Sequence, residues 1–148
     1  MDDIGSEIND YLTAYAATLT AFDSHAAAGL WGEPGMILDD RGAGVIESRE
    51  AMASGLERSY PLYRKLGLAS VGFEHVSHER LSERIFLVRV RWLFYAKDGS
   101  RLTDSTGSYL LRRDDEGFRA FVNVPADDLE KLQALATAQG IDLADPTS

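Results

Sequence analysis

Residues 86–94 read Phe-Leu-Val-Arg-Val-Arg-Trp-Leu-Phe, and this run carries the clearest structural signal in the chain. Large apolar side chains occupy alternate positions, and two arginines lie among the positions between them. A period of two in residues that favour strands predicts a β-strand with one buried face. Asp98-Gly99 follows as a hairpin signal, so a second strand over 102–113 is expected to pair with the first.

Further strands extend this hairpin in both directions. Alternation at 71–74 predicts an earlier strand, and the run 118–124 follows a turn at 114–117. Consecutive strands joined by tight turns favour an antiparallel meander over a parallel sheet. Pro125 ends the sheet, and the leucines after it recur at helical spacing, which predicts a C-terminal helix over about 127–139.

Before Gly67 the apolar residues recur with the period of a helix. Spacings of three and four place them on one face over 8–22 and again over 52–66. Asp23 and Ser48 are suited to begin helices, because their side-chain oxygens accept the free N–H groups of a first turn. The change of period after Gly67 therefore places helices before a sheet, which is typical of an α+β fold.

Proline and glycine predict the interruptions in this helical half. A short apolar run favours a strand at 36–38, and Gly42 and Gly44 indicate a turn after it. Pro61 is expected to interrupt or kink the second long helix, because proline lacks an N–H group and clashes one turn back. The fold class predicted is thus α+β, with a curved antiparallel sheet wrapped around the N-terminal helices.

Composition limits the possible partners. The 148 residues carry a net charge of -9, so phosphate backbones are repelled and nucleic acid is not an expected partner. The absence of cysteine excludes disulfides and cysteine-based zinc sites. Neither a signal peptide nor a membrane-spanning run of roughly 18 apolar residues is recognised, so a cytoplasmic protein without membrane contact is expected. The length suits one domain over 1–141, followed by a flexible tail over 142–148.

Three groups of motifs occur in a characteristic order. They are 15–31 with Asp23 and Trp31, then Asp40, Gly44 and Glu50-Ala51-Met52, then Gly107 to Arg113 followed by Gly117-Phe118-Arg119. In this order the chain resembles the NTF2-like superfamily, and its SnoaL-like branch in particular, over about residues 5–125. The resemblance implies a cone-shaped (cystatin-like) α+β fold with a pocket between sheet and helices. It also implies a homodimer formed through the outer face of the sheet, and the C-terminal helix is an extension of this fold.

Eight aromatic side chains are expected to line that pocket. They are Tyr15, Phe22, Trp31, Tyr60, Tyr63, Trp92, Tyr109 and Phe121. Tyrosine and tryptophan present an apolar body with a polar tip, which suits a small apolar ligand that carries one or two oxygens. The alternative is that these rings fill an ordinary core.

The resemblance also suggests catalytic residues. Ketosteroid isomerases of this superfamily use a tyrosine on the first helix, an aspartate base before the second long helix, and an acid on a late strand. Tyr15 and Asp40 (or Asp39) lie at the first two places, and Tyr109 occupies the third, where a neutral phenol can still donate to an oxyanion. The candidates are therefore Asp40, Tyr15 and Tyr109, and the alternative role of the two aspartates is in a turn. No cofactor and no metal is expected.

Other polar groups favour structural roles. Arg89, Arg91 and Asp104 are expected to pair across strands on the outer face, although epoxide hydrolases of the superfamily use an Asp-Arg-Asp arrangement. His75 and His78 are three apart on a predicted strand, so they should point to opposite faces and form no two-ligand metal site. His25 lies near the expected mouth of the pocket, where it is either a general base or a surface residue.

Three functions remain open from the sequence. The first is binding of a small apolar oxygenated ligand. The second is a cofactor-independent enzyme of isomerase, cyclase or dehydratase type, which requires the Asp40 side chain to point into the cavity. The third is a non-catalytic homodimeric module, which a pocket collapsed by Trp92 and Tyr60 would favour.

Overall fold

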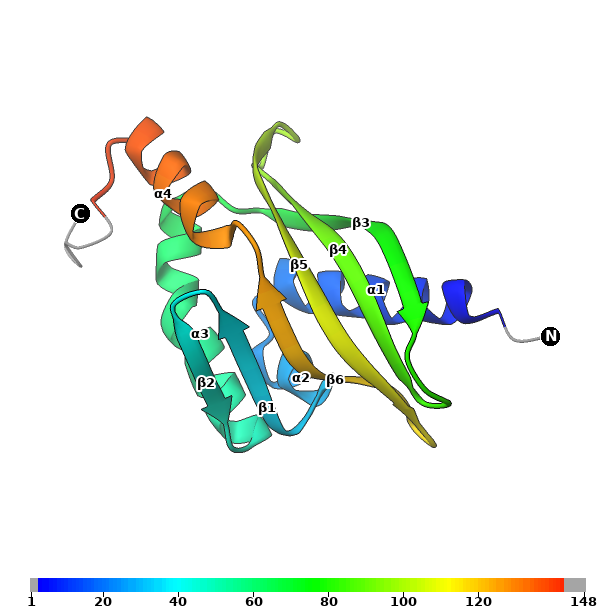
Figure 1. The fold of residues 1–148 in the computed structure, drawn as a ribbon. Helices are drawn as coiled ribbons and strands as arrows, with labels where there is room; N and C mark the ends of the chain where they lie inside the picture. Colours follow the sequence, from blue (N-terminus) through cyan, green and yellow to red (C-terminus); the bar gives the residue numbers. More distant parts are fainter. Residues whose placement is uncertain (1–2, 143–148) are drawn as a thin grey trace.

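A computed structural model describes residues 3–142, which form helices and strands in the order that Figure 1 shows. The elements are α1 (Ile4–Thr20), α2 (Ser24–Gly29), β1 (Trp31–Asp39), β2 (Gly42–Ile46), α3 (Arg49–Lys65), β3 (Ser70–Arg80), β4 (Ile85–Tyr95), β5 (Arg101–Asp114), β6 (Gly117–Pro125) and α4 (Asp128–Ala138). Helices thus precede a meander of long strands, as the change of period after Gly67 predicts, and the α+β class is confirmed.

The strands form one sheet in the order β2-β1-β6-β5-β4-β3. Neighbouring strands are antiparallel except β1 and β6, which run parallel with Trp31 opposite Ala120. The expectation of a wholly antiparallel sheet is therefore wrong at this pair. Since α1 and α2 carry the chain across the sheet before β1 begins, β1 meets β6 in the same direction, and the Leu30 carbonyl accepts the Ala120 N–H at 3.0 Å.

The turn predicted at Gly42 and Gly44 is displaced. Both glycines lie in β2, where they pair with Asp39 and Ile37 of β1. The turn lies just before them, because the Asp39 carboxylate accepts the N–H groups of Arg41 (2.8 Å) and Gly42 (3.2 Å). A carboxylate that binds the backbone two and three residues further along is a strong local turn signal.

The helices begin where the sequence indicates. Asp23 accepts the N–H of Ala26 at the start of α2, and Ser48 accepts the N–H of Ala51 at the start of α3. The interruption expected at Pro61 does not occur, because α3 continues as far as Lys65. Buried side chains on both sides of the proline, including Tyr60, hold the helix against the others and compensate for the lost N–H group.

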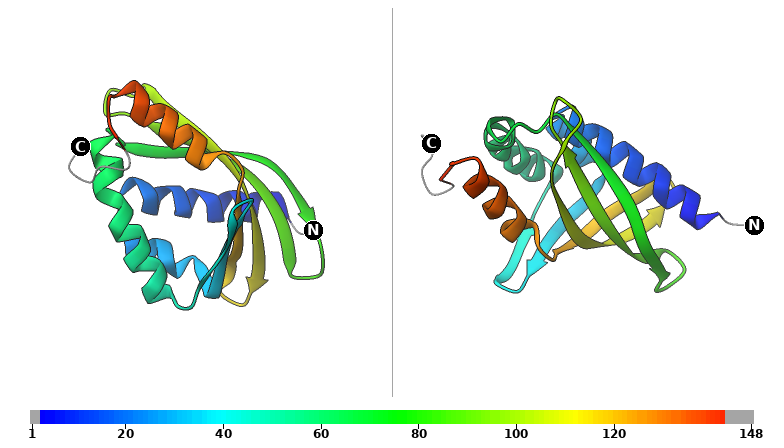
Figure 2. Two further views of the ribbon diagram at one scale, coloured as in Figure 1. Left: turned by 60° about the vertical axis from the view of Figure 1, so that its left-hand side comes forward. Right: turned by 90° about the horizontal axis from the view of Figure 1, so that it is seen from above.

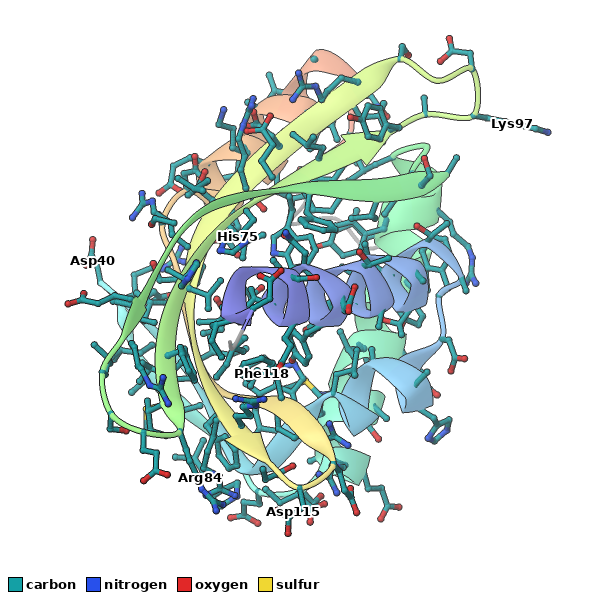
Figure 3. All side chains as sticks on the ribbon, turned by 90° about the vertical axis from the view of Figure 1, so that its right-hand side faces the viewer. Asp40, His75, Arg84, Lys97, Asp115 and Phe118 are labelled. Carbon is teal, nitrogen blue, oxygen red and sulfur yellow. The ribbon has the colours of Figure 1, made fainter. Side chains whose placement is uncertain are left out.

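The sheet curves around α1, which lies across its concave face (Figures 2 and 3). Ile8 and Leu12 of α1 are buried against the inward side chains of β4, among them Phe86, Val88 and Val90. Alternate residues of β4 thus provide the core, as the period of two predicts. Apolar contact between helix and sheet is the main stabilising contribution at this interface.

α4 closes one end of the molecule. Pro125, the last residue of β6, pairs with Gly107, so β6 does not reach the first part of β5. α4 packs beside this unpaired part of β5 (Figure 1). The Asp127 carboxylate accepts the Thr106 N–H at 2.7 Å rather than capping α4, and Gln139 Nε2 donates to the Leu66 carbonyl at 2.8 Å. α4 therefore joins β5 to the end of α3.

Within residues 3–142, no helix is both long and apolar enough to cross a membrane. Apart from Asp142, the flexible tail predicted over 142–148 lies outside the described residues. The division into one domain over 1–141 stays a prediction.

Candidate ligand-binding site

A cavity of about 280 Å³ lies between α1, α3 and the concave face of the sheet. Its volume lies just below the range typical of small-molecule sites, which is roughly 300 to 1,000 Å³. Apolar and aromatic side chains form most of the wall, while Ser59, Ser105, Thr106, Asn123 and Asp128 contribute polar groups. The cavity is not collapsed by Trp92 and Tyr60, which both line it.

Four aromatic rings form the floor of the cavity. Trp31 Nε1 donates to the Tyr15 hydroxyl oxygen at 2.8 Å, and Trp92 Nε1 donates to the Tyr109 hydroxyl oxygen at 3.0 Å. The two pairs also touch each other, since the ring centroids of Tyr15 and Trp92 are 5.4 Å apart and those of Trp31 and Tyr109 are 6.5 Å apart. Tilted and edge-to-face rings at these distances attract one another and hold the floor rigid.

The hydrogen bonds from the two indoles determine which hydrogen-bonding groups the two phenols present to a ligand. Each phenol oxygen accepts one hydrogen bond from an indole, which leaves its own proton available as a donor. Burial raises the pKa of Tyr15 to about 12, and burial together with the neighbouring Tyr15 raises the pKa of Tyr109 well above 10. Both phenols therefore stay neutral near pH 7 and act as hydrogen-bond donors.

Two further oxygens in the wall have no hydrogen-bond partner among the described residues. One is the hydroxyl of Tyr60, a side chain that is only 7% exposed, and the other is Asn123 Oδ1. Asn123 lies opposite Tyr109 across β5 and β6, so both side chains face the cavity. A buried polar group without a partner costs about 1–3 kcal/mol, so these oxygens require an explanation.

Charge is almost absent from this wall. Among the described residues that line the cavity, none is lysine, arginine or histidine, and the one carboxylate is that of Asp128 at the start of α4. A buried anion would need a cation or several donors to offset its lost hydration. The wall consequently suits uncharged groups.

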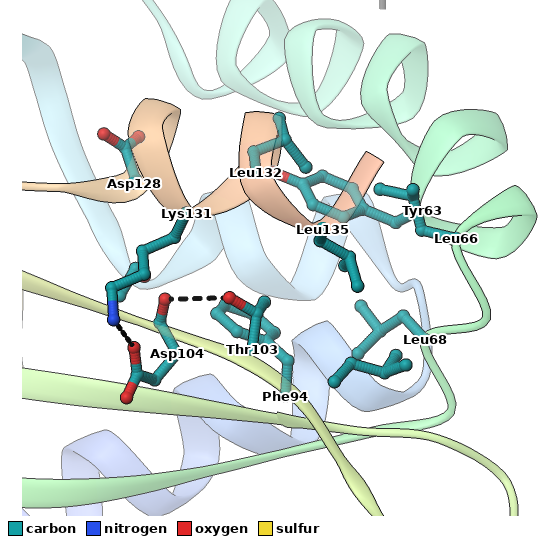
Figure 4. Close-up of a pocket in the computed structure, with 12 residues that line it drawn as sticks. Tyr63, Leu66, Leu68, Phe94, Thr103, Asp104, Asp128, Lys131, Leu132 and Leu135 are labelled. Carbon is teal, nitrogen blue, oxygen red and sulfur yellow. Dashed lines mark hydrogen bonds and ion pairs between the residues drawn. The ribbon is translucent and has the colours of Figure 1, made fainter. Parts of the chain in front are cut away.

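A second, smaller cavity of about 40 Å³ lies under α4 (Figure 4). Leu132 and Leu135 of α4 cover it opposite Tyr63, Leu66 and Phe94, and the ion pair of Lys131 with Asp104 (2.7 Å) borders it. Some of its lining residues, including Tyr63, also line the main cavity. α4 thus forms part of the same enclosure.

The structure brings seven of the eight predicted aromatic residues to the wall of the main cavity. The exception is Phe121, which is not among the lining residues and packs against Gly32 and under the Arg112 guanidinium, 4.4 Å from its ring centroid. The register between β5 and β6 shifts between Leu110 and Leu111, so Phe121 is an unpaired bulge residue. Phe121 directly follows the buried Ala120, so alternation places it on the outer side of the sheet, and the bulge changes the faces only of the residues after it.

Asp40 does not join the other two predicted catalytic residues. It is exposed in the turn between β1 and β2 and lines neither cavity, and its side chain points away from the molecule in Figure 3. Asp39 forms a salt bridge with Arg41 at 2.9 Å, which together with its backbone bonds lowers the pKa of its carboxyl. The turn alternative is therefore correct for this pair, while Tyr15 and Tyr109 lie side by side in the cavity floor.

The prediction that the two β3 histidines point to opposite faces is wrong. A bulge at residue 76 shifts the register between β3 and β4, so His75 and His78 project from the same face. His78 Nδ1 lies 3.0 Å from His75 Nε2, and His75 Nδ1 lies 3.1 Å from Asn9 Oδ1. The pair contacts α1 rather than the cavity, and His25 is 82% exposed and lines neither cavity.

Arg91 and Asp104 pair across the strands as expected. Arg91 binds Asp104 on the neighbouring strand and also Glu74, at 3.2 Å. Lys131 of α4 joins the same carboxylate, and these hydrogen bonds lower the pKa of Asp104. This network anchors α4 to the sheet. Arg89 is exposed in β4 and lines neither cavity.

Asn123 and Asp128 are site residues that the sequence did not indicate. Asn123 occupies an inward position only because the bulge at Phe121 changes the phase of β6. A strict period of two from Phe118 and Ala120 would turn Asn123 outward. No local signal in the sequence predicts such a bulge.

A family model described as "NTF2-like protein (DUF6841)" matches residues 3–128 of this chain. Comparison with curated proteins finds no match.

Solved structures with the same architecture are numerous. A domain of unknown function with a cystatin-like fold from Nostoc punctiforme is 14% identical and has a TM-score of 0.69, covering 97% of this chain and 91% of that one. Aln2 from a Streptomyces species is 13% identical with a TM-score of 0.68, covering 90% and 97%. A ketosteroid isomerase-like protein from Erwinia carotovora is 15% identical with a TM-score of 0.62, covering 84% and 96%. At such identities the likeness concerns the fold alone.

Proposed function

This chain belongs to the NTF2-like protein family DUF6841, and we propose that it binds a small, apolar, oxygenated ligand in the cavity between its sheet and its helices. The observation that carries the proposal is the floor of the cavity, where two phenols are each oriented by an indole. Oriented neutral donors within an apolar wall are what such a ligand needs for its oxygen. Protein cores are close-packed, so an empty volume of about 280 Å³ beside these phenols is not expected of an ordinary core.

The chain has two tryptophans, and both line the cavity, so intrinsic fluorescence reports on its contents. Decalone, a saturated bicyclic ketone whose carbonyl absorbs only weakly where tryptophan does, is a suitable probe. We expect saturable quenching or a spectral shift, and we expect Tyr109→Phe to weaken binding about three- to tenfold, because the ketone loses one neutral hydrogen bond.

Decalin, which has no oxygen, and Tyr95→Phe on β4 are the matched controls. Decalin should bind wild type and Tyr109→Phe equally, and Tyr95→Phe should bind decalone as wild type does, because Tyr95 does not line the cavity. If neither decalin nor decalone perturbs the fluorescence of the wild-type protein, the binding proposal is wrong.

The enzyme alternative loses its assigned base. Asp40 lies in an exposed turn, so the sequence-based combination of Asp40 with Tyr15 and Tyr109 is not retained. Phenol donors alone can polarise a carbonyl, but proton abstraction also needs a base within hydrogen-bond reach. With Asp40 outside the cavity, ligand binding is the function that the geometry supports best.

We further propose that the chain forms a homodimer through the outer face of the sheet. Exposed apolar side chains gather there on β2, β1 and β6, including Val45 (60% exposed), Leu38 and Val124. Charged outer-face residues such as Arg91 and Glu74 lie on the other strands. Contiguous exposed apolar surface is characteristic of an interface.

Two finer assignments remain proposals as well. Membership of the SnoaL-like branch is supported by the order of the motifs that begin near Tyr15 and end near Gly117. The second is a cytoplasmic location.

A further inference from the structure

We infer that the ligand is an uncharged hydroxyketone, or a compound with the same pair of groups, and that Asn123 selects its hydroxyl. This inference rests on the proposed function and names the ligand class for the same cavity. Three features of the wall support it. The hydroxyl protons of Tyr15 and Tyr109 are available to a ligand acceptor, Asn123 Oδ1 is available to a ligand donor, and no cationic side chain is found among the described residues of the wall.

The donors are the phenols of the floor. Tyr15 and Tyr109 already accept N–H groups from Trp31 and Trp92, and their raised pKa values keep both protons in place. Two donors that face one apolar space are complementary to an oxygen that only accepts. A ketone or another carbonyl group fulfils this requirement, because its oxygen carries two lone pairs and no proton.

The acceptor is Asn123 Oδ1. It is buried, it has no partner among the described residues, and an amide oxygen can only accept. Gly107 on the adjacent strand makes room for it, because a Cβ atom at that position would lie 3.3 Å from Oδ1. A ligand hydroxyl at this place would remove the cost of the unpaired oxygen, whereas a ketone could not, because it has no proton to donate.

The Tyr60 hydroxyl is a less selective partner. It is a buried oxygen without a partner, and burial followed by the charge of Asp23 raises its pKa, so it remains protonated. A neutral phenol both donates and accepts, so Tyr60 tolerates either ligand group. Selectivity for a hydroxyl therefore depends on Asn123.

The charged side chains of the cavity wall restrict the class of ligand further. The described part of the wall offers no lysine, arginine or histidine to a carboxylate or phosphate, and Asp128 would repel either anion. Transfer of an uncompensated anion into such a site is far more costly than transfer of a ketone of the same shape. An anionic ligand is consequently excluded.

A series on one skeleton tests this inference. Decalone, decalin carboxylate and a set of hydroxydecalones with the hydroxyl at each position of the second ring are titrated against the wild-type protein, with tryptophan fluorescence and calorimetry as readouts. At least one hydroxydecalone should bind about three- to tenfold more tightly than decalone, the gain expected for one hydrogen bond to a buried acceptor. The carboxylate should bind about a hundredfold more weakly than decalone.

Asn123→Leu, which keeps the side-chain shape, should abolish the gain from the hydroxyl and leave decalone binding intact. Asn9→Leu is the matched control, since Asn9 is the chain's other asparagine, is exposed on α1, and lies outside the cavity. It should retain the preference.

Each adverse outcome has one meaning. If decalone binds but no hydroxydecalone binds more tightly, or the carboxylate binds as well as the ketone, the ligand class is wrong while the proposed function stands. If the preference persists in Asn123→Leu, Asn123 is not the selecting residue. Should Asn123→Leu fail to fold, the wild-type series alone still decides the ligand class. If nothing in the series binds, the proposed function itself fails.

Discussion

Tyr15 and Tyr109 differ from ordinary buried tyrosines in that each oxygen accepts an indole N–H and retains its own proton. This arrangement arises because the four residues come from α1, β1, β4 and β5 and meet only in the folded chain. The residue types could be named from the sequence, since aromatic side chains with polar tips are conspicuous. Their pairing could not, because it depends on contacts between elements that are distant along the chain.

The histidine pair on β3 gives a pH prediction at the same scale. Burial, and then the positive charge of His78, lowers the pKa of His75, so the folded protein binds this proton less readily than the unfolded chain, whose histidines titrate near ~6.5. Below that pH the unfolded state takes up the proton first, so stability falls as the pH decreases from neutrality. His75→Gln should reduce this loss, measured as the melting temperature between about pH 7.5 and 5.5.

His25→Gln is the matched control, because His25 is exposed on α2 and far from this pair in the sequence. Its stability should follow the pH dependence of the wild-type protein. A His75→Gln variant whose melting temperature depends on pH as steeply as that of wild type would contradict the assignment.

At the scale of elements, α4 shows how a predicted helix acquires a structural role. Leucine spacing predicts the helix, but its place beside β5 follows from the early end of β6 and from the Asp127 bond to Thr106. The bulges in β3 and β6, in contrast to this helix, were not predicted from the sequence. Each inserts one residue, which reverses the faces of the following positions and moved His78 and Asn123 to sides that simple alternation excludes.

The docking of α4 is testable through Leu135, which packs over the smaller cavity with Leu66 and Phe94. Leu135→Ala should lower the free energy of unfolding by about 1–2 kcal/mol, somewhat less than for a fully buried leucine. Urea denaturation measures this change, and Gln133→Ala on the exposed side of α4 should have little effect. Equal stability of the two variants would show that α4 contributes no packing.

For the whole molecule, the curvature of the sheet creates two different surfaces. The concave face wraps α1 and encloses the cavity, whereas the convex face exposes apolar side chains such as Val124 and Val45. A polar sheet face would be expected if it were only solvated, since antiparallel sheets with one wet face alternate apolar and polar residues. The apolar convex face is the physical reason for the proposed homodimer.

Light scattering coupled to gel filtration measures this association. The wild-type protein should elute with twice the 16.3 kDa mass of the chain, and Val124→Lys should shift the population to monomer, because a buried ammonium without a partner is strongly unfavourable at an interface. Val76→Lys, in the bulge of the edge strand β3, should remain dimeric. A monomeric wild-type protein at micromolar concentration would contradict the dimer.

What the sequence determined by itself is local: the period of two over 86–94, the caps at Asp23 and Ser48, and the change from helix to strand after Gly67. These features depend on neighbouring residues and are visible in any short window. The tertiary structure alone decided which side chains meet in the cavity, because strand register, bulges and the parallel pairing of β1 with β6 depend on contacts between distant segments. For that reason the aromatic wall and the turn alternative for Asp40 could be anticipated, whereas the inward turn of Asn123 could not.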